Sequence, residues 1–157
     1  MLYFAYGSNL NLFQMKRRCK DSVFLKKYEL IGYRLNFRSK YRAADIEARK
    51  NSTVPGGLFE ISKSDERKLD VYEDYPLLYK KYYFNYYGKK IMTYTMTKKT
   101  KFKYPTERYL NVIKTIKNRE VRASVHYGSK FYYIKQNPFY RKILFERRSL
   151  SYCSCLL

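Results

Sequence analysis

The sequence lacks the residues that several common kinds of functional site require. It has no tryptophan, one histidine (His126) and three cysteines (Cys19, Cys153 and Cys155). Cysteines that are odd in number and unevenly placed do not suit a disulfide framework. The Cys-Ser-Cys spacing near the C-terminus is wrong for a zinc knuckle, and His126 lies in an irregular region that disfavours a Ser-His-Asp or Cys-His arrangement. We therefore expect no metal site.

Long apolar segments are also absent. No run approaches the roughly 18 residues that a transmembrane helix requires. A signal peptide begins with a basic segment followed by an apolar one, and the N-terminus has no such pattern. Phosphate-binding loops that end in Lys-Ser or Lys-Thr are missing, and so are dinucleotide-binding fingerprints. We therefore expect a cytoplasmic protein with no membrane partner and no cofactor.

Acidic residues are scarce, with 13 Asp and Glu against 34 Lys and Arg, which gives a formal net charge of +21. Such a charge attracts anions, including nucleic acid. Residues 79–90, YKKYYFNYYGKK, alternate aromatic and basic side chains as single-strand binders do. The same tyrosines also have the spacing of an ordinary sheet face. A catalytically inactive basic module that binds nucleic acid or an acidic protein therefore stays open as an alternative function.

The first half of the chain predicts strands on either side of a helix. Residues 1–6 predict a short buried strand, and 9–19 predict a helix capped by Asn9 or Asn11. One side of this helix is expected to hold Leu10, Phe13 and Arg17. Further strands are predicted over 23–40 (broken at Gly32), 43–49 and 58–61, with a loop over 51–57.

The clearest helix is predicted over 62–74, where Ser62 caps it, Asp65 resembles the second half of a capping box, and Tyr75-Pro76 ends it. A β-hairpin over 80–96 is expected to turn near Gly88-Lys89, before a helix over 106–118. The chain has 157 residues, 45% of them hydrophobic, which suits one domain. These elements predict an α+β fold whose mixed or antiparallel sheet closes into a small barrel.

The first strand runs directly into the turn Tyr6-Gly7-Ser8-Asn9. A glycine here can adopt positive φ and lets a ligand approach the backbone. If a helix starts near Asn9, free amide groups at its positive end can hold an anion or a carbonyl oxygen that gains charge. Ser8 and Asn9 add side-chain donors. The alternative is an ordinary strand-to-helix turn with a polar cap.

Glu73 lies at the end of the 62–74 helix, among Tyr72, Asp74 and Tyr75. The negative end of the helix dipole, the aromatic neighbours and a second acid should all raise its pKa. A general base that works at neutral pH benefits from such a pKa. The alternative is a solvated helix end.

Three segments, 3–11 (YFAYGSNLN), 32–37 (GYRLNF) and 54–81 (VPGGLFEISKSDERKLDVYEDYPLLYKK), occur in an order and spacing that resemble the γ-glutamylcyclotransferase-like family. The resemblance covers residues 1 to about 117. It implies a compact β-barrel flanked by helices, with a substrate cavity at one mouth. It also implies a cofactor-free reaction in which the α-amine of a γ-glutamyl group attacks its own γ-carbonyl. The products are 5-oxoproline and a free amine or amino acid.

The resemblance also implies roles for individual residues. Glu73 matches the catalytic general acid and base of the family. The turn formed by Tyr6, Gly7, Ser8, Asn9 and Leu10 matches the loop that binds the γ-glutamyl group. Tyr79 and Tyr109 match tyrosines that line the pocket. γ-Glutamyl amino acids, γ-glutamyl-ε-lysine and small γ-glutamyl amines all stay open as substrates.

The chain departs from the family pattern at two places. Asp74 follows the glutamate where the family usually has glycine, so a second carboxylate would raise the pKa of Glu73 further or crowd the site. Residues 118–157 form a basic, aromatic and poorly periodic tail in place of a final amphipathic helix. Three origins for the tail stay open: an extension that binds an acidic partner, a reading-frame slip, or a segment that packs on the barrel. The packing residues would be Phe131, Tyr133, Phe139, Ile143 and Phe145.

Overall fold

The computed structural model of this protein describes residues 1–107 and 109, so the predictions for the tail and for most of the 106–118 helix lie outside the described residues. The strands are β1 (Leu2–Ala5), β2 (Val23–Arg38), β3 (Ala43–Glu60), β4 (Tyr79–Tyr86) and β5 (Lys89–Met96). The helices are α1 (Leu12–Arg18) and α2 (Lys63–Tyr72), and a short 3₁₀ turn, η1, spans Ser8–Leu10. None of the described helices is long and apolar enough to cross a membrane.

The five strands form one mixed sheet in the order β2-β3-β1-β5-β4. The short strand β1 lies in the centre, antiparallel to β3 and parallel to β5, while β2–β3 and β4–β5 are antiparallel hairpins. The predicted α+β class is therefore confirmed. Tyr87 and Gly88 join β4 to β5 with positive φ at both positions, the conformation that favours a tight hairpin turn.

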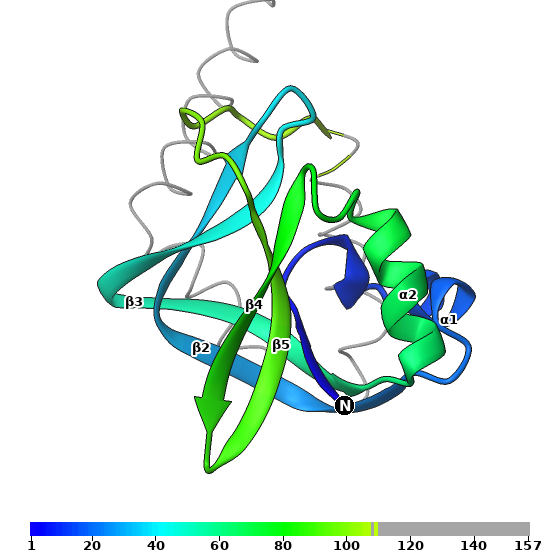
Figure 1. The fold of residues 1–157 in the computed structure, drawn as a ribbon. Helices are drawn as coiled ribbons and strands as arrows, with labels where there is room; N and C mark the ends of the chain where they lie inside the picture. The colour runs from blue at the N-terminus through cyan, green and yellow to red at the C-terminus, as the bar shows by residue number, and fades with distance from the viewer. Residues whose placement is uncertain (108, 110–157) are drawn as a thin grey trace, which may run out of the picture. The chain divides into compact units, whose positions relative to one another are not determined.

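The sheet curls, and side chains rather than a backbone ladder connect its two edge strands. Tyr28 of β2 packs against Phe84 and Tyr86 of β4, with ring centroids 6.1 Å and 4.9 Å apart. The hydroxyls of Tyr33 and Tyr82 also form a 2.5 Å hydrogen bond between β2 and β4. Among the described strands, no backbone ladder joins the edge strands β2 and β4. The sheet therefore curls like a barrel but stays open (Figure 1).

The prediction of a loop over 51–57 is wrong, because β3 continues through these residues. Val54 is buried and pairs with Leu30, and Gly56 and Gly57 pair with Tyr28 and Lys27 of β2. The glycines allow close packing inside the sheet. A Cβ at Gly56 would collide with the ring of Phe4 and the carbonyl of Ala5.

The predicted helix side with Leu10, Phe13 and Arg17 is not the side that packs on the core, and Leu10 lies before the helix. Phe13 is 66% exposed, whereas Met15 and Cys19 are buried. The η1 turn precedes the helix, and Asn11 caps it by accepting a hydrogen bond from the Gln14 amide at 3.0 Å. The helix therefore begins at Leu12, and this start places Met15 rather than Phe13 against the core.

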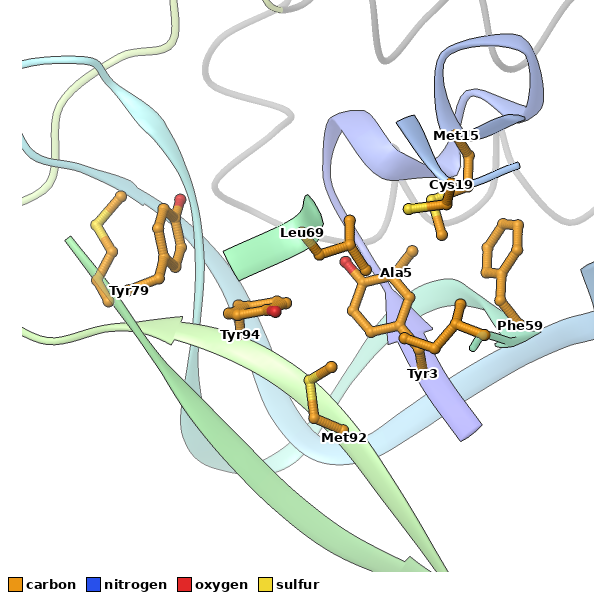
Figure 2. Close-up of a cluster of buried hydrophobic side chains, with 11 residues drawn as sticks. Tyr3, Ala5, Met15, Cys19, Phe59, Leu69, Tyr79, Met92 and Tyr94 are labelled. Carbon is orange, nitrogen blue, oxygen red and sulfur yellow. The ribbon is translucent and has the colours of Figure 1, made fainter. Parts of the chain in front are cut away.

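The main core lies between the central strands and the two helices. Tyr3 and Ala5 of β1, Met92 and Tyr94 of β5 and Leu69 of α2 belong to one buried cluster (Figure 2). Leu69 is fully buried, so the C-terminal half of α2 is fixed against the sheet. This packing determines where the residues after Tyr72 lie.

The glycine contacts predict a difference between two neighbouring substitutions. Gly56→Ala should lower the free energy of unfolding by about 3 kcal/mol, because backbone and a buried ring block the new methyl group. Gly57→Ala should cost less than about 1 kcal/mol, because its nearest neighbour, 2.9 Å away, is the ring end of the partly exposed Phe24. Urea denaturation of both variants measures the difference, and equal losses would contradict this account of β3.

Candidate active site

The turn after β1 brings the chain to one side of the central sheet. Tyr6 is buried and donates a hydrogen bond to the Tyr94 carbonyl at 2.8 Å, which fixes the start of the turn. Gly7 has φ −114°, so the expected positive φ is wrong. Its lack of a side chain matters instead. A Cβ there would lie 3.0 Å from the Tyr109 hydroxyl and 3.3 Å from the Ala44 Cβ.

The end of α2 places Glu73 through a defined C-terminal motif. Ser62 caps the helix as predicted, because its hydroxyl accepts a hydrogen bond from the Asp65 amide at 3.0 Å. At the other end Asp74 has φ +51°, its amide donates to Val71, and the Tyr75 amide donates to Asp70. This is the Schellman pattern, in which the residue with positive φ is usually glycine. Asp74 therefore performs a backbone role in which aspartate is tolerated.

Asn9 and Glu73 meet although 64 residues separate them. The Asn9 side-chain nitrogen donates to Glu73 Oε1 at 2.8 Å and to the Tyr3 hydroxyl at 3.0 Å. Asn9 itself is buried. The turn after β1 and the end of α2, which the sequence indicated as separate candidate sites, therefore lie in direct contact.

Arg18 holds the other end of the Asn9 amide. Its guanidinium donates to Asn9 Oδ1 at 2.7 Å and to Gln14 Oε1 at 3.0 Å, and it stacks 3.6 Å from the centre of the Tyr72 ring. Because Arg18 can only donate, it requires the oxygen of the Asn9 amide on its side. The amide nitrogen must then face Glu73.

Burial raises the pKa of Glu73 from its ordinary value of 4.5 to about 7. The Glu73 residue keeps some exposed surface, but protein surrounds its carboxyl group. The hydrogen bond from Asn9 and the charge of Arg18 act in the opposite direction and lower the pKa. The neighbouring Asp74, which we expected to contribute, does not cause the raised value.

A cavity of about 30 Å³ lies beside Glu73. Its described lining is Tyr3, Tyr6, Gly7, Ser8, Asn9, Ala44, Glu73, Tyr79, Tyr94 and Tyr109. Seven of the eight residues that the sequence predicted are present here. The exception is Leu10, which packs against the hydrophobic core.

Sequence reasoning missed Tyr3, Ala44 and Tyr94 in the cavity wall and Arg18 behind it. Strand alternation indicates that Tyr3 and Tyr94 face the core, together with Ala5 and Met92. It does not show which of the 20 tyrosines surround the acid. For Ala44 and Arg18 no local signal exists.

Two tyrosines meet at the backbone of Ala44. The Tyr79 hydroxyl donates to the Ala44 carbonyl at 2.5 Å. The Tyr109 hydroxyl accepts from the Ala44 amide at 3.3 Å and also bonds with the backbone of Ser8. Burial, together with the nearby charge of Glu73, raises the pKa of both phenols well above the usual range. Both hydroxyls therefore stay protonated at neutral pH.

A larger open cleft of about 560 Å³ adjoins the cavity. Ser8 and Tyr109 line both spaces, so they form the wall between them. The other described lining residues of the cleft are Gln14, Arg17, Arg18, Tyr41, Tyr72 and Thr106. Among the described residues, no group of three or more His, Cys, Asp or Glu side chains is arranged to hold a metal ion.

Residues 3–114 match the profile of the family described as gamma-glutamyl cyclotransferase, AIG2-like. The chain belongs to this family. The match includes both the turn after β1 and Glu73, so the predicted family is confirmed. Among curated proteins, none matches the chain in sequence.

Solved structures resemble this family member in fold. A protein named gamma-glutamyl cyclotransferase is 22% identical, with a TM-score of 0.65 over 86% of this chain and 84% of its own. An uncharacterized protein from Homo sapiens is 22% identical, with a TM-score of 0.64 over 85% and 84%. YkqA from Bacillus subtilis is 21% identical, with a TM-score of 0.63 over 95% of this chain and 54% of YkqA. At these identities the likeness establishes the fold alone.

The raised pKa of Glu73 predicts that this residue destabilises the fold at high pH. Between pH 4.5 and about 7 the folded state binds more protons than the unfolded state, so the free energy of unfolding falls as pH rises through this window. Glu73→Gln keeps an acceptor for Asn9 but removes the charge. At pH 8 it should therefore be more stable than the parent by about 2–3 kcal/mol.

Urea denaturation at pH 5 and pH 8 measures this effect. Glu60→Gln, at an exposed position, is the control and should leave the pH dependence of the parent unchanged. If Glu73→Gln also leaves it unchanged, the Glu73 carboxyl group is not buried as described.

The positive φ at Asp74 predicts an effect on stability of its own. Asp74→Gly should raise the free energy of unfolding by about 0.5–1 kcal/mol, because glycine adopts this conformation without strain. Asp74→Ala, which has a Cβ and no polar group, should lower it by about 1 kcal/mol. Thermal unfolding of the two variants gives the comparison, and the opposite order would disprove the assigned backbone role.

Proposed function

We propose that this chain is a cyclotransferase that acts on γ-glutamyl amino acids or γ-glutamyl amines and releases 5-oxoproline. The observation that carries the proposal is the Glu73 carboxyl group. It is enclosed, has a pKa of about 7, and faces a polar cavity in a member of the gamma-glutamyl cyclotransferase, AIG2-like family. A carboxyl group with this pKa can take up and release a proton at neutral pH.

In the proposed reaction, the carboxylate of Glu73 takes a proton from the α-ammonium group of the substrate. The freed amine attacks the γ-carbonyl carbon, and a new C–N bond closes the five-membered ring. Glu73 gives this proton to the leaving nitrogen, and its carboxylate then takes the second proton that the ring nitrogen must lose. The bond from the same carbon to the leaving nitrogen breaks, and Glu73 passes the second proton to the freed amine, which departs as an ammonium ion. Atoms and charges balance, and no covalent enzyme intermediate is required.

The γ-carbonyl oxygen needs hydrogen-bond donors, because negative charge develops on it during the attack. In the structure the backbone amide of Ala44 and the backbone of Ser8 both bond with the Tyr109 hydroxyl oxygen. We infer that the substrate oxygen takes this position. The inference agrees with the size of the cavity, because about 30 Å³ is enough only for about one water molecule. The γ-glutamyl group therefore enters only when a wall side chain moves, and Tyr109 separates the cavity from the open cleft.

These groups suffice for an intramolecular reaction. The nucleophile and the carbonyl belong to one molecule, so the protein mainly folds the substrate into a ring-like pose. A single acid/base group contributes about 10²–10⁴-fold, and donors to the oxyanion contribute a similar factor.

The alternative, an inactive basic module that binds nucleic acid, has no specific support in the site. The aromatic side chains of residues 79–90 mostly serve internal packing. Tyr79 is buried in the cavity wall, Tyr82 bonds with Tyr33, and Phe84 and Tyr86 pack on Tyr28.

Substitution of Glu73 tests the proposed function directly. Glu73→Gln should lower kcat for 5-oxoproline release by about 10²–10⁴-fold, because the proton carrier is lost while the hydrogen bond to Asn9 stays. In the parent protein kcat/KM should rise with pH through about 7, as Glu73 loses its proton. Product release from a panel of γ-glutamyl amino acids and amines, followed by chromatography, provides the measurement.

Asp74→Asn is the matched control. It converts the adjacent carboxyl group to an amide, and no described contact places that group in the cavity. It should retain most of the activity. The mechanism fails if both variants lose equal activity, or if Glu73→Gln stays active.

A further inference from the structure

The open cleft beside the cavity has the position of a leaving-group site, if the proposed function holds. Ser8 and Tyr109 line both spaces, and Tyr72 of the cleft directly precedes Glu73. With the γ-glutamyl end against Glu73, the group attached to the γ-nitrogen must extend outward past this wall. The cleft volume of about 560 Å³ is large enough for an amino acid.

The charged side chains that line the described part of the cleft are all positive. Arg17 and Arg18 line it, and no Asp or Glu is among its described lining residues. Arg18 bonds with the neutral side chains of Asn9 and Gln14. Within the described part of the chain, neither arginine forms an ion pair with a carboxylate. Arg17 therefore has no described carboxylate partner, and Arg18 keeps further N–H donors, beyond its two described bonds, for an anionic ligand.

The two arginines differ in depth. Arg18 is half-buried, stacked on Tyr72 and tied to Asn9, so it lies near the reacting end of the site. Arg17 is exposed, and its described contact is the face of Phe13, 6.0 Å away. A ligand with two carboxylates, one beside the reacting nitrogen and one on a side chain, matches this arrangement.

We propose that the cleft selects an acidic amino acid as the leaving group, so that the preferred substrates are γ-glutamyl dipeptides such as γ-glutamyl-glutamate. Arg18 receives the α-carboxylate, and Arg17 receives the side-chain carboxylate. Guanidinium groups suit this task because their planar fork can donate two hydrogen bonds to one carboxylate. Tyr41 and Tyr72 provide aromatic walls for the aliphatic part of the leaving group.

A pair of substrates of equal size tests the proposal. γ-Glutamyl-glutamate and γ-glutamyl-glutamine differ only in whether the side chain of the leaving group is a carboxylate or an amide. We expect kcat/KM to be about three- to fivefold higher for the acidic substrate, as for an ion pair with an exposed arginine. 5-Oxoproline release at fixed ionic strength measures both rates.

Variants separate the cleft from the general field of a chain with net charge +21. Arg17→Gln should reduce the acidic-to-neutral ratio to about two or less, and Arg17→Lys should give an intermediate ratio, because it keeps charge without the fork. Lys89→Gln removes an equal charge from the exposed β4–β5 turn and should leave the ratio near that of the parent. Circular dichroism checks that each variant is folded.

The outcomes distinguish this proposal from the one on which it rests. Equal rates for the two substrates, or a ratio that Arg17→Gln and Lys89→Gln change equally, would overturn the acidic leaving-group site and leave the cyclotransferase activity standing. If neither substrate nor the wider γ-glutamyl panel yields 5-oxoproline, both proposals are wrong.

Discussion

One carboxyl group that is enclosed by protein, with a single described hydrogen-bond donor, is the constraint on which the rest of the site depends. Glu73 is placed there by the Schellman motif after α2, and α2 is fixed by the buried Leu69. Asn9 reaches the carboxyl group from the turn after β1, and Arg18 sets the direction of the Asn9 amide. Each element contributes a donor or a wall, but burial is what brings the Glu73 pKa close to neutrality. If water entered freely, the same residues would surround an ordinary, fully ionised glutamate.

The tyrosines around Glu73 combine two properties that few side chains share. Their rings are large and apolar enough to exclude water, and their hydroxyls supply hydrogen bonds at defined points. Tyr3 accepts from Asn9, Tyr6 donates to the Tyr94 carbonyl, and Tyr79 donates to Ala44. Because burial keeps these phenols protonated, they add no competing charge beside the carboxylate. The wall is therefore polar in its contacts and neutral in its charge.

Features with local causes were predictable, and features that depend on packing were not. The Ser62 cap of α2 and the β4–β5 hairpin follow from short-range patterns, and both are confirmed. The glycines at 56 and 57 resemble loop residues, but they lie in β3 because neighbouring strands pack closely against them. That the turn after β1 and Glu73 share one site was inferred from a family resemblance, since no periodicity links residues so far apart; the hydrogen bond between Asn9 and Glu73 itself was not predicted. Ala44 and Arg18 enter the site only through the register of β3 and the position of α1, which no local pattern encodes.

The Tyr109 hydroxyl occupies the point where the backbone groups of Ala44 and Ser8 converge. Those two groups consequently keep a hydrogen-bond partner when no ligand is bound. In the proposed reaction, entry of a substrate would exchange one oxygen for another, so the number of hydrogen bonds would hardly change. Recognition by these two groups would then add little to ground-state affinity. They would favour the proposed reaction only as the incoming oxygen becomes more negative than a phenol.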